Sequence, residues 1–139
     1  MSESTARSAT RVLLYSDDRT VRQQLRLALG RRLAADLPDI ETVECATYQA
    51  VLKTLDAGGI DLLILDGEAV PLGGMGLARQ VRDEIPNCPP LLLLVARVAD
   101  AWLATWSRAD AVVTYPLDPE RLARTATELL RARSGAAAQ

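Results

Sequence analysis

The sequence predicts an α/β domain in which helices cover both faces of a single, doubly wound sheet of five parallel strands. Short apolar segments alternate with segments whose apolar residues recur every three or four positions, as in strands and amphipathic helices. The segment 89–96 (PPLLLLVA) is apolar almost throughout, which fits the centre of a parallel sheet. The length of 139 residues suits one core, so we expect one domain at 11–133, a disordered leader at 1–10 and a disordered tail at 134–139.

Strands and helices are predicted to alternate along the whole domain. In order, the strands are expected at 11–16, 40–46, 60–66, 89–96 and 110–115, and the helices at 19–36, 47–59, 77–85, 99–109 and 118–133.

Local signals support these elements in turn. The first strand is a short apolar run, and the helix after it carries apolar residues at fourfold spacing. The second strand alternates weakly, as an edge strand does. Thr47 is a suitable cap for the second helix, which the pair Gly58–Gly59 ends. The third helix stops before Pro86, and the last helix begins with Asp118 as its cap and Pro119 at its first position.

The composition excludes several classes of function. The chain contains no histidine, which excludes histidine-dependent catalysis and a phosphohistidine intermediate. A net charge of −2 and a pI near 5.1 provide no basic surface for nucleic acid. No apolar run is long enough for a membrane span or a secretory signal. We therefore expect a cytoplasmic protein in which Cys45 and Cys88 are reduced, buried thiols.

Carboxylates follow two of the predicted strands where each strand ends. Asp17 and Asp18 follow the first strand, and Asp66 ends the third. Because parallel strands present their carboxyl ends at one edge of the sheet, these side chains are expected to converge in an acidic pocket. Oxygen ligands without histidine or cysteine suit Mg²⁺. In the alternative interpretation, Asp17 caps the next helix and Asp66 is solvated at a strand end.

Three segments resemble the receiver domains of response regulators: VLLYSDD at 12–18, IDLLILD at 60–66 and ADAVVTYPLDPERL at 109–122. The resemblance covers nearly all of the chain that is predicted to be ordered. It implies a flavodoxin-like sheet with the strand order 2-1-3-4-5. It also implies that Asp66 accepts a phosphoryl group from a histidine kinase, and that Asp17, Asp66 and the main-chain carbonyl of Glu68 hold Mg²⁺.

The sequence departs from the receiver pattern at several positions. Aligning TVRQQL with the usual start of the first helix places Ser16 at the first of the family's two acidic positions. A shift of one residue would restore the pair as Asp17–Asp18, and both alignments stay open. The other altered switch positions are Val95 in place of a serine or threonine, Val112 in place of an aromatic residue, and Tyr115 in place of the lysine before proline.

These departures are expected to weaken the conventional switch. The family's lysine pairs with a phosphoryl group that carries nearly two negative charges. One such pair at about 4 Å is worth on the order of 4 kcal/mol at an effective dielectric of about 20. Tyr115 offers a hydrogen bond worth roughly 0.5–1.5 kcal/mol and no cation. We therefore expect an atypical receiver that signals through protein contact, is not an enzyme, and is weakly or never phosphorylated on Asp66.

Two alternatives stay open. In one, the protein is a working phosphoryl acceptor in a two-component phosphorelay, and Arg97 or Arg19 replaces the missing lysine. In the other, the fold carries a small-molecule or enzymatic function. Against the second, SDDRTVR lacks the composition of a flavin phosphate loop. The segment DGE at 66–68 is a poor match to a phosphatase motif, and the only lysine of the chain, Lys53, lies in a helix.

The partner surface is predicted from two tryptophans. Trp102 and Trp106 are four residues apart and share one face of the helix expected at 99–109. In receivers this helix borders the surface for dimerisation and output, so we expect a histidine kinase, an effector protein or a second copy to contact it. The alternative is that one or both tryptophans pack against the sheet. A solvated surface is expected for the arginines in and after the first helix (Arg22, Arg26, Arg31 and Arg32).

Overall fold

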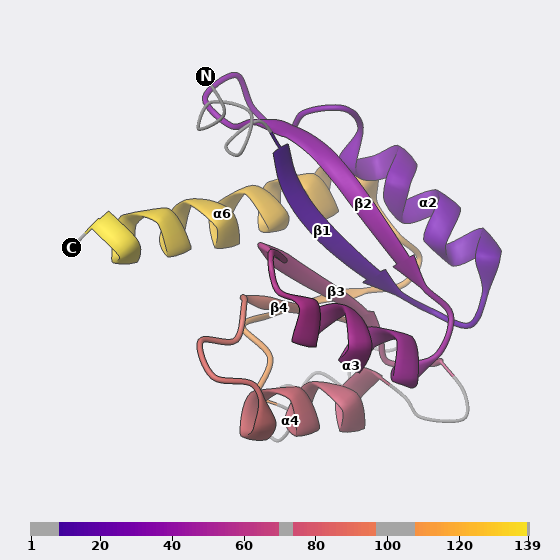
Figure 1. Ribbon diagram of the computed structural model, residues 1–139. Helices are drawn as coiled ribbons and strands as arrows, with labels where there is room; N and C mark the ends of the chain where they lie inside the picture. The colour runs from indigo at the N-terminus through magenta and orange to yellow at the C-terminus, as the bar shows by residue number, and fades with distance from the viewer. Residues whose placement is uncertain (1–8, 70–73, 97–107, 139) are drawn as a thin grey trace.

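The computed structural model describes residues 9–69, 74–96 and 108–138, which form one sheet with helices on both faces (Figure 1). The described elements, in chain order, are β1 (Ala9–Tyr15), α2 (Arg19–Leu29), β2 (Asp39–Cys45), α3 (Tyr48–Ala57), β3 (Leu62–Asp66), α4 (Gly74–Glu84), β4 (Leu91–Val95), β5 (Ala111–Thr114) and α6 (Pro119–Ala138).

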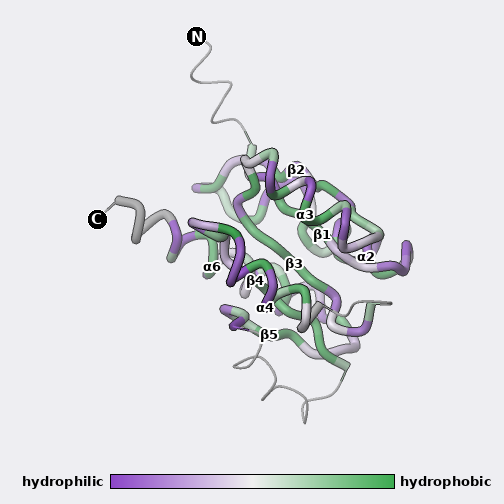
Figure 2. Tube along the Cα trace, turned by 60° about the horizontal axis from the view of Figure 1, so that its bottom comes forward, coloured by the Kyte–Doolittle hydropathy of each residue, from purple (hydrophilic) through white to green (hydrophobic). Residues whose placement is uncertain are grey.

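The five strands are parallel and lie in the order β2-β1-β3-β4-β5, which confirms the predicted fold class and topology. Every residue of β3 and β4 is buried, as the apolar run predicted, and the tube of β3 is apolar along most of its length in Figure 2. The edge strand β2 is only partly buried. The chain leaves β1 for β2 and returns to β3 on the other side, so the carboxyl ends of β1 and β3 are neighbours at the point where ligands bind in such sheets.

The strands divide their side chains between two apolar clusters, because successive residues point to opposite faces. On one face α3 and α4 cover the sheet, and on the other α2 and α6 do so (Figure 1). The helix residues buried on the first face include Val51, Leu55, Leu77 and Val81, and those on the second include Leu25, Leu29, Leu122, Ala126 and Leu130. The sheet is therefore packed on both faces, and its carboxyl edge, where β1 and β3 end, lies between the two clusters.

Helix capping follows the sequence signals closely. The Thr47 hydroxyl accepts a hydrogen bond from the amide of Ala50 at 3.2 Å, and Gly58 ends α3 with a φ of 82°. The Asp118 carboxylate accepts from the amide of Glu120 at 3.0 Å at the start of α6. The first helix is shorter than predicted. It ends at Leu29 because Gly30 takes a φ of 65° and its amide bonds back into the last turn.

Two predicted domain boundaries are wrong. β1 begins at Ala9, two residues before the predicted start of the domain, because residues 9 and 10 pair with the start of β2. The tail predicted at 134–139 is instead helical as far as Ala138. Three alanines favour helix strongly enough there to continue α6 past Gly135. α4 also begins three residues earlier than predicted, at Gly74, because glycine gives no helical pattern in the sequence.

Three of the four arginines in and after α2 are exposed, as predicted (Arg26, Arg31 and Arg32), but all four form ion pairs with carboxylates of β2. Arg22 and Arg26 both reach Glu44 of β2, at 2.9 and 2.8 Å. Arg31 and Arg32 both reach Asp39 at the start of the same strand, at 3.4 and 3.0 Å. The carboxylates of the edge strand thus tie it to the neighbouring helix, and they place charge along an otherwise unpaired sheet edge. No helix in the described ranges combines the length and the apolar composition needed to cross a membrane.

Candidate functional site

Asp66 is the last residue of β3 and lies at the carboxyl edge of the sheet, in register with Leu94 of β4. The residue is only 3% exposed. Its Oδ2 accepts a hydrogen bond from the Ser16 hydroxyl at 2.7 Å, and its Oδ1 accepts from the amide of Glu68 at 2.9 Å. A buried carboxylate needs such donors. Both oxygens have one, so the side chain is fixed in a single orientation without a cation.

Ser16, immediately after β1, is fully buried, and all of its polar groups are used. Its amide donates to the carbonyl of Cys45 at 3.2 Å, and its carbonyl accepts from Arg22 Nη1 at 2.6 Å. Its hydroxyl accepts from the amide of Asp18 at 3.0 Å, which directs the hydroxyl hydrogen to Asp66. An aspartate at position 16 would instead place a second carboxylate beside Asp66. The serine therefore removes one negative charge from this edge and supplies a donor.

The structure separates the roles of the two aspartates that follow. Both Asp17 and Asp18 are exposed. Asp18 is the N-cap of α2 and accepts from the amide of Thr20 at 2.8 Å, so the cap is Asp18 and not Asp17. The residue that contacts Asp66 is Ser16, which favours the alignment that pairs positions 16 and 17. The alternative of a solvated Asp66 is wrong, because that side chain is buried.

The loop after Asp66 follows the end of β4 closely. The amide of Gly67 donates to the carbonyl of Leu94 at 2.8 Å. A Cβ on Gly67 would lie 2.5 Å from that same carbonyl oxygen, so only glycine fits here. Glu68 is exposed, and its carboxylate accepts from the amide of Ala96 at 3.3 Å. These contacts connect the Asp66 loop to the strand end where a receiver carries its hydroxyl.

Three altered switch positions, on β4, on β5 and directly after β5, are buried or partly buried. Val95 is fully buried and belongs to the apolar cluster beneath α3 and α4, against which Val112 also packs. Val95 presents no hydroxyl to the pocket. Tyr115 follows β5, donates its amide to the carbonyl of Val95 at 2.9 Å, and packs its ring against the cluster on the other face. The peptide bond between Tyr115 and Pro116 is cis.

The hydroxyl of Tyr115 is buried near Asp66, but it makes no hydrogen bond of ordinary length and angle with the described residues. Burial raises the pKa of Tyr115 above its ordinary value. The charge of Asp66 and hydrogen bonding toward its carboxylate raise the pKa further, with smaller contributions from the charges of Glu68 and Asp18. The same edge affects Tyr15, whose pKa is raised first by burial and then by the charges of Asp17 and Asp66. Four carboxylates thus affect the tyrosines at the carboxyl edge of the sheet: Asp17, Asp18, Asp66 and Glu68. Tyr115 contributes a neutral hydrogen-bond donor to this edge.

We expect this environment to appear in the alkaline unfolding of the protein. The raised pKa means that the fold favours the neutral phenol of Tyr115. This stabilisation is complete below the unfolded-state pKa of about 10 and is lost as pH rises above that value. The free energy of unfolding, measured by urea titration at a series of pH values, should fall above pH about 10, and less steeply for Tyr115→Phe. Equal slopes for both proteins would contradict the assignment.

Removing the Ser16 hydroxyl should destabilise the protein, because Ser16→Ala leaves one oxygen of the buried Asp66 and the amide of Asp18 without partners. We expect a loss of about 1–3 kcal/mol in the free energy of unfolding. In Asp66→Asn the amide can still accept from Ser16, so a smaller loss is expected. Chemical denaturation of both variants measures the difference, and a Ser16→Ala variant as stable as the wild type would show that the bond contributes nothing.

No group of three or more aspartate, glutamate or cysteine side chains forms a metal site in the described part of the chain. Asp66 nevertheless keeps free lone pairs on both oxygens, since each accepts one protein hydrogen bond. A divalent cation here would take oxygen ligands from Asp66, from an exposed aspartate beside it and from the main chain, and would complete its shell with water. These oxygen ligands are of the type that Mg²⁺ prefers, but the described residues supply few of them from side chains.

Several predicted residues fall elsewhere. Arg97, Trp102 and Trp106 lie outside the described residues, and Arg19 is exposed at the start of α2.

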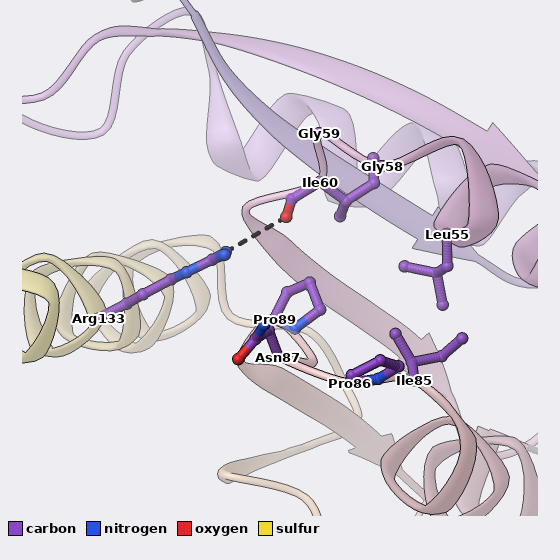
Figure 3. A pocket seen from close by; sticks show the side chains of 9 residues that line it. All are labelled: Leu55, Gly58, Gly59, Ile60, Ile85, Pro86, Asn87, Pro89 and Arg133. Carbon is purple, nitrogen blue, oxygen red and sulfur yellow. Dashed lines mark hydrogen bonds between the residues drawn. The ribbon is translucent and has the colours of Figure 1, made fainter.

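A pocket of about 150 Å³ opens at the opposite, amino edge of the sheet, where Arg133 donates to the carbonyl of Ile60 at 3.2 Å (Figure 3). It is smaller than the roughly 300–1,000 Å³ of most ligand pockets and is remote from Asp66. The candidate site is therefore placed at the carboxyl edge, where Asp66 lies, and not at this pocket.

The chain has close sequence relatives, although no protein-family model matches it. It is 54% identical over 125 residues to an uncharacterized response regulatory protein of Mycobacterium tuberculosis, a match that covers 90% of this chain and 94% of the relative. It is 31% identical over 126 residues to the transcriptional regulatory protein CseB of Streptomyces avermitilis. That match covers 88% of this chain and 49% of CseB.

Solved structures agree with these relatives. A CheY-like response regulator receiver domain protein from Methanospirillum hungatei aligns with a TM-score of 0.73 at 18% identity, covering 92% of this chain and 98% of that one. The response regulator TrrA from Thermotoga maritima, in complex with Mg²⁺ and BeF, aligns with a TM-score of 0.71 at 25% identity, covering 87% and 99%. Strand order, the placement of Asp66 and a near full-length relative agree: the chain belongs to the response regulators, as a receiver domain of two-component signalling.

Proposed function

We propose that this receiver is atypical: it acts through contact with other proteins, and phosphorylation of Asp66 is weak or absent. The observation that supports this most directly is Tyr115, which follows β5 where the family has a lysine. Its hydroxyl is buried beside Asp66 and is kept neutral by its surroundings. The site thereby has a hydrogen-bond donor where a phosphorylated receiver needs a positive charge.

Charge in the described part of the chain favours the same conclusion. Most other carboxylates near the sheet edges are matched by arginines, as Glu44 and Asp39 are. No ion pair between described residues involves Asp17, Asp66 or Glu68. A phosphoryl group on Asp66 would add nearly two negative charges among these carboxylates. Each unfavourable pair near 4 Å costs on the order of 4 kcal/mol at an effective dielectric of about 20.

We infer that Mg²⁺ binding is correspondingly weak. TrrA was solved in complex with Mg²⁺ and BeF. In this chain the residues that the resemblance to receivers assigns to Mg²⁺ are Asp17, Asp66 and the carbonyl of Glu68. Ser16 occupies the position of one acidic residue, which lowers the negative charge available to a cation. When bound, the cation would neutralise part of the charge around Asp66.

The partner in this proposal is another protein: a histidine kinase, an effector or a second copy of the chain. The proposed contact surface includes Trp102 and Trp106. Replacing Trp106 with a charged residue should weaken self-association or partner binding without unfolding the domain.

We propose a cytoplasmic location, where thiols stay reduced. Burial raises the pKa of the Cys45 thiol, so that less of it is present as the reactive thiolate.

Intact-mass spectrometry after incubation with acetyl phosphate and Mg²⁺ tests the proposal. The wild type is expected to gain little or no mass, as Asp66→Asn does. A stoichiometric gain of one phosphoryl group in the wild type, lost in Asp66→Asn, would favour a working phosphoryl acceptor instead. Arg97→Ala and Arg19→Ala would then show whether either arginine replaces the lysine, because removing the true substitute abolishes the adduct.

A further inference from the structure

Arg22 links the edge strand to the candidate site. Its guanidinium donates from Nε to Glu44 at 2.9 Å and from Nη1 to the carbonyl of Ser16 at 2.6 Å. Its side chain is only 13% exposed, whereas that of Arg26 on the same helix is 46% exposed. The planar fork of arginine suits this double contact, which the point charge of lysine cannot reproduce.

The carbonyl that Arg22 holds belongs to the residue that orients Asp66. Ser16 is fixed by its amide to β2, by its carbonyl to Arg22 and by its hydroxyl to Asp66. Loss of the carbonyl contact would free the peptide unit between Ser16 and Asp17. A movement of that unit would displace the hydroxyl and change the angle at which it meets the carboxylate.

We propose that Arg22 is a positioning residue for this site: anchored by Glu44 of β2, it fixes the Ser16 segment and thereby the orientation of Asp66. This role could not be predicted from the sequence, because Arg22 lies in an arginine-rich helix with an exposed polar face. The proposal goes beyond the proposed function, since it holds whether or not Asp66 accepts a phosphoryl group.

Arg26 provides a matched control. It makes a contact of the same kind with the same carboxylate, at 2.8 Å from Glu44, and no hydrogen bond joins it to Ser16. Arg22→Gln and Arg26→Gln therefore each remove one charge and one ion pair with Glu44. Only the first removes the donor to the Ser16 carbonyl.

Amide hydrogen exchange followed by NMR tests the proposal. The amides of Ser16, Asp18 and Glu68 donate to Cys45, Ser16 and Asp66, so they report directly on the segment. In Arg22→Gln their exchange should accelerate at least about tenfold relative to amides of β4. In Arg26→Gln the exchange rates of these three amides, relative to the amides of β4, should stay near the wild-type values. Uniform acceleration in Arg22→Gln, or equal local effects in the two variants, would overturn the proposal.

A double-mutant cycle examines the path through the hydroxyl. In a Ser16→Ala background, Arg22→Gln should no longer change the exchange of the Glu68 amide, because the link to Asp66 is already absent. An unchanged effect in that background would show that Arg22 does not act through Ser16. If Arg22→Gln fails to fold, Arg22→Lys and Arg26→Lys give the same comparison. The acceleration of exchange at the three amides should then be smaller in Arg22→Lys than that expected for Arg22→Gln. It should still be larger than in Arg26→Lys.

Discussion

Replacing Tyr115 with lysine is expected to raise the yield of phosphorylated Asp66 by about tenfold or more. The new ammonium would lie where the buried hydroxyl now faces Asp66. A pair near 4 Å is worth on the order of 4 kcal/mol at an effective dielectric of about 20, and a third of that already corresponds to about tenfold. The measurement is the fraction of protein that gains one phosphoryl group after incubation with acetyl phosphate and Mg²⁺, followed over time.

Tyr115→Phe is the matched control for this substitution. It removes the hydroxyl without adding a cation, so the phosphorylated fraction should stay at the wild-type level. Because the hydroxyl makes no hydrogen bond of ordinary length and angle with the described residues, the free energy of unfolding should stay within about 1 kcal/mol of the wild type or rise. If the phenylalanine variant became as reactive as the lysine variant, the missing charge would not be what limits phosphorylation.

Gly67→Ala should cause the largest loss of stability at the site, about 2–4 kcal/mol. The added methyl group would lie 2.5 Å from the carbonyl oxygen of Leu94, to which the Gly67 amide is itself bonded at 2.8 Å. Relieving that overlap requires β3 and β4 to separate or the Asp66 loop to move. Urea denaturation of the two proteins measures the loss.

Glu68→Ala, one residue later, is the control for Gly67→Ala. Its side chain is exposed and its single described contact is to the amide of Ala96, so we expect a change of less than about 1 kcal/mol. If Gly67→Ala were as stable as Glu68→Ala, the close approach of the two strand ends would not be a constraint on the fold.

Much of the fold could be predicted because it depends on local patterns. The continuous apolar run at Leu91–Val95 indicated a central strand, and Thr47 and Asp118 marked helix starts through capping chemistry. These signals lie within a few residues of the element that they define. The ends of the domain were missed, because strand pairing at Ala9 depends on a partner some thirty residues away.

The site could be predicted only in part. The position of Asp66 follows from the rule on strand ends, but the hydrogen bond from Ser16 to its Oδ2 joins residues fifty positions apart. The choice between Ser16 and Asp17 as the first of the pair depended on which of the two side chains contacts Asp66. The contact from Arg22 to Ser16 could not be inferred, because nothing in the helical pattern distinguishes Arg22 from Arg26.

The most direct test of the account is to add beryllofluoride and Mg²⁺ to isotopically labelled protein and follow the backbone amides by NMR. If the pocket around Asp66 cannot stabilise a phosphoryl-like group, the amides of Glu68, Ala96 and Tyr115 should show no saturable shifts beyond those seen in Asp66→Asn. Saturable shifts of these amides in the wild type alone would contradict it, because they would mean that the site binds the group and rearranges without a lysine.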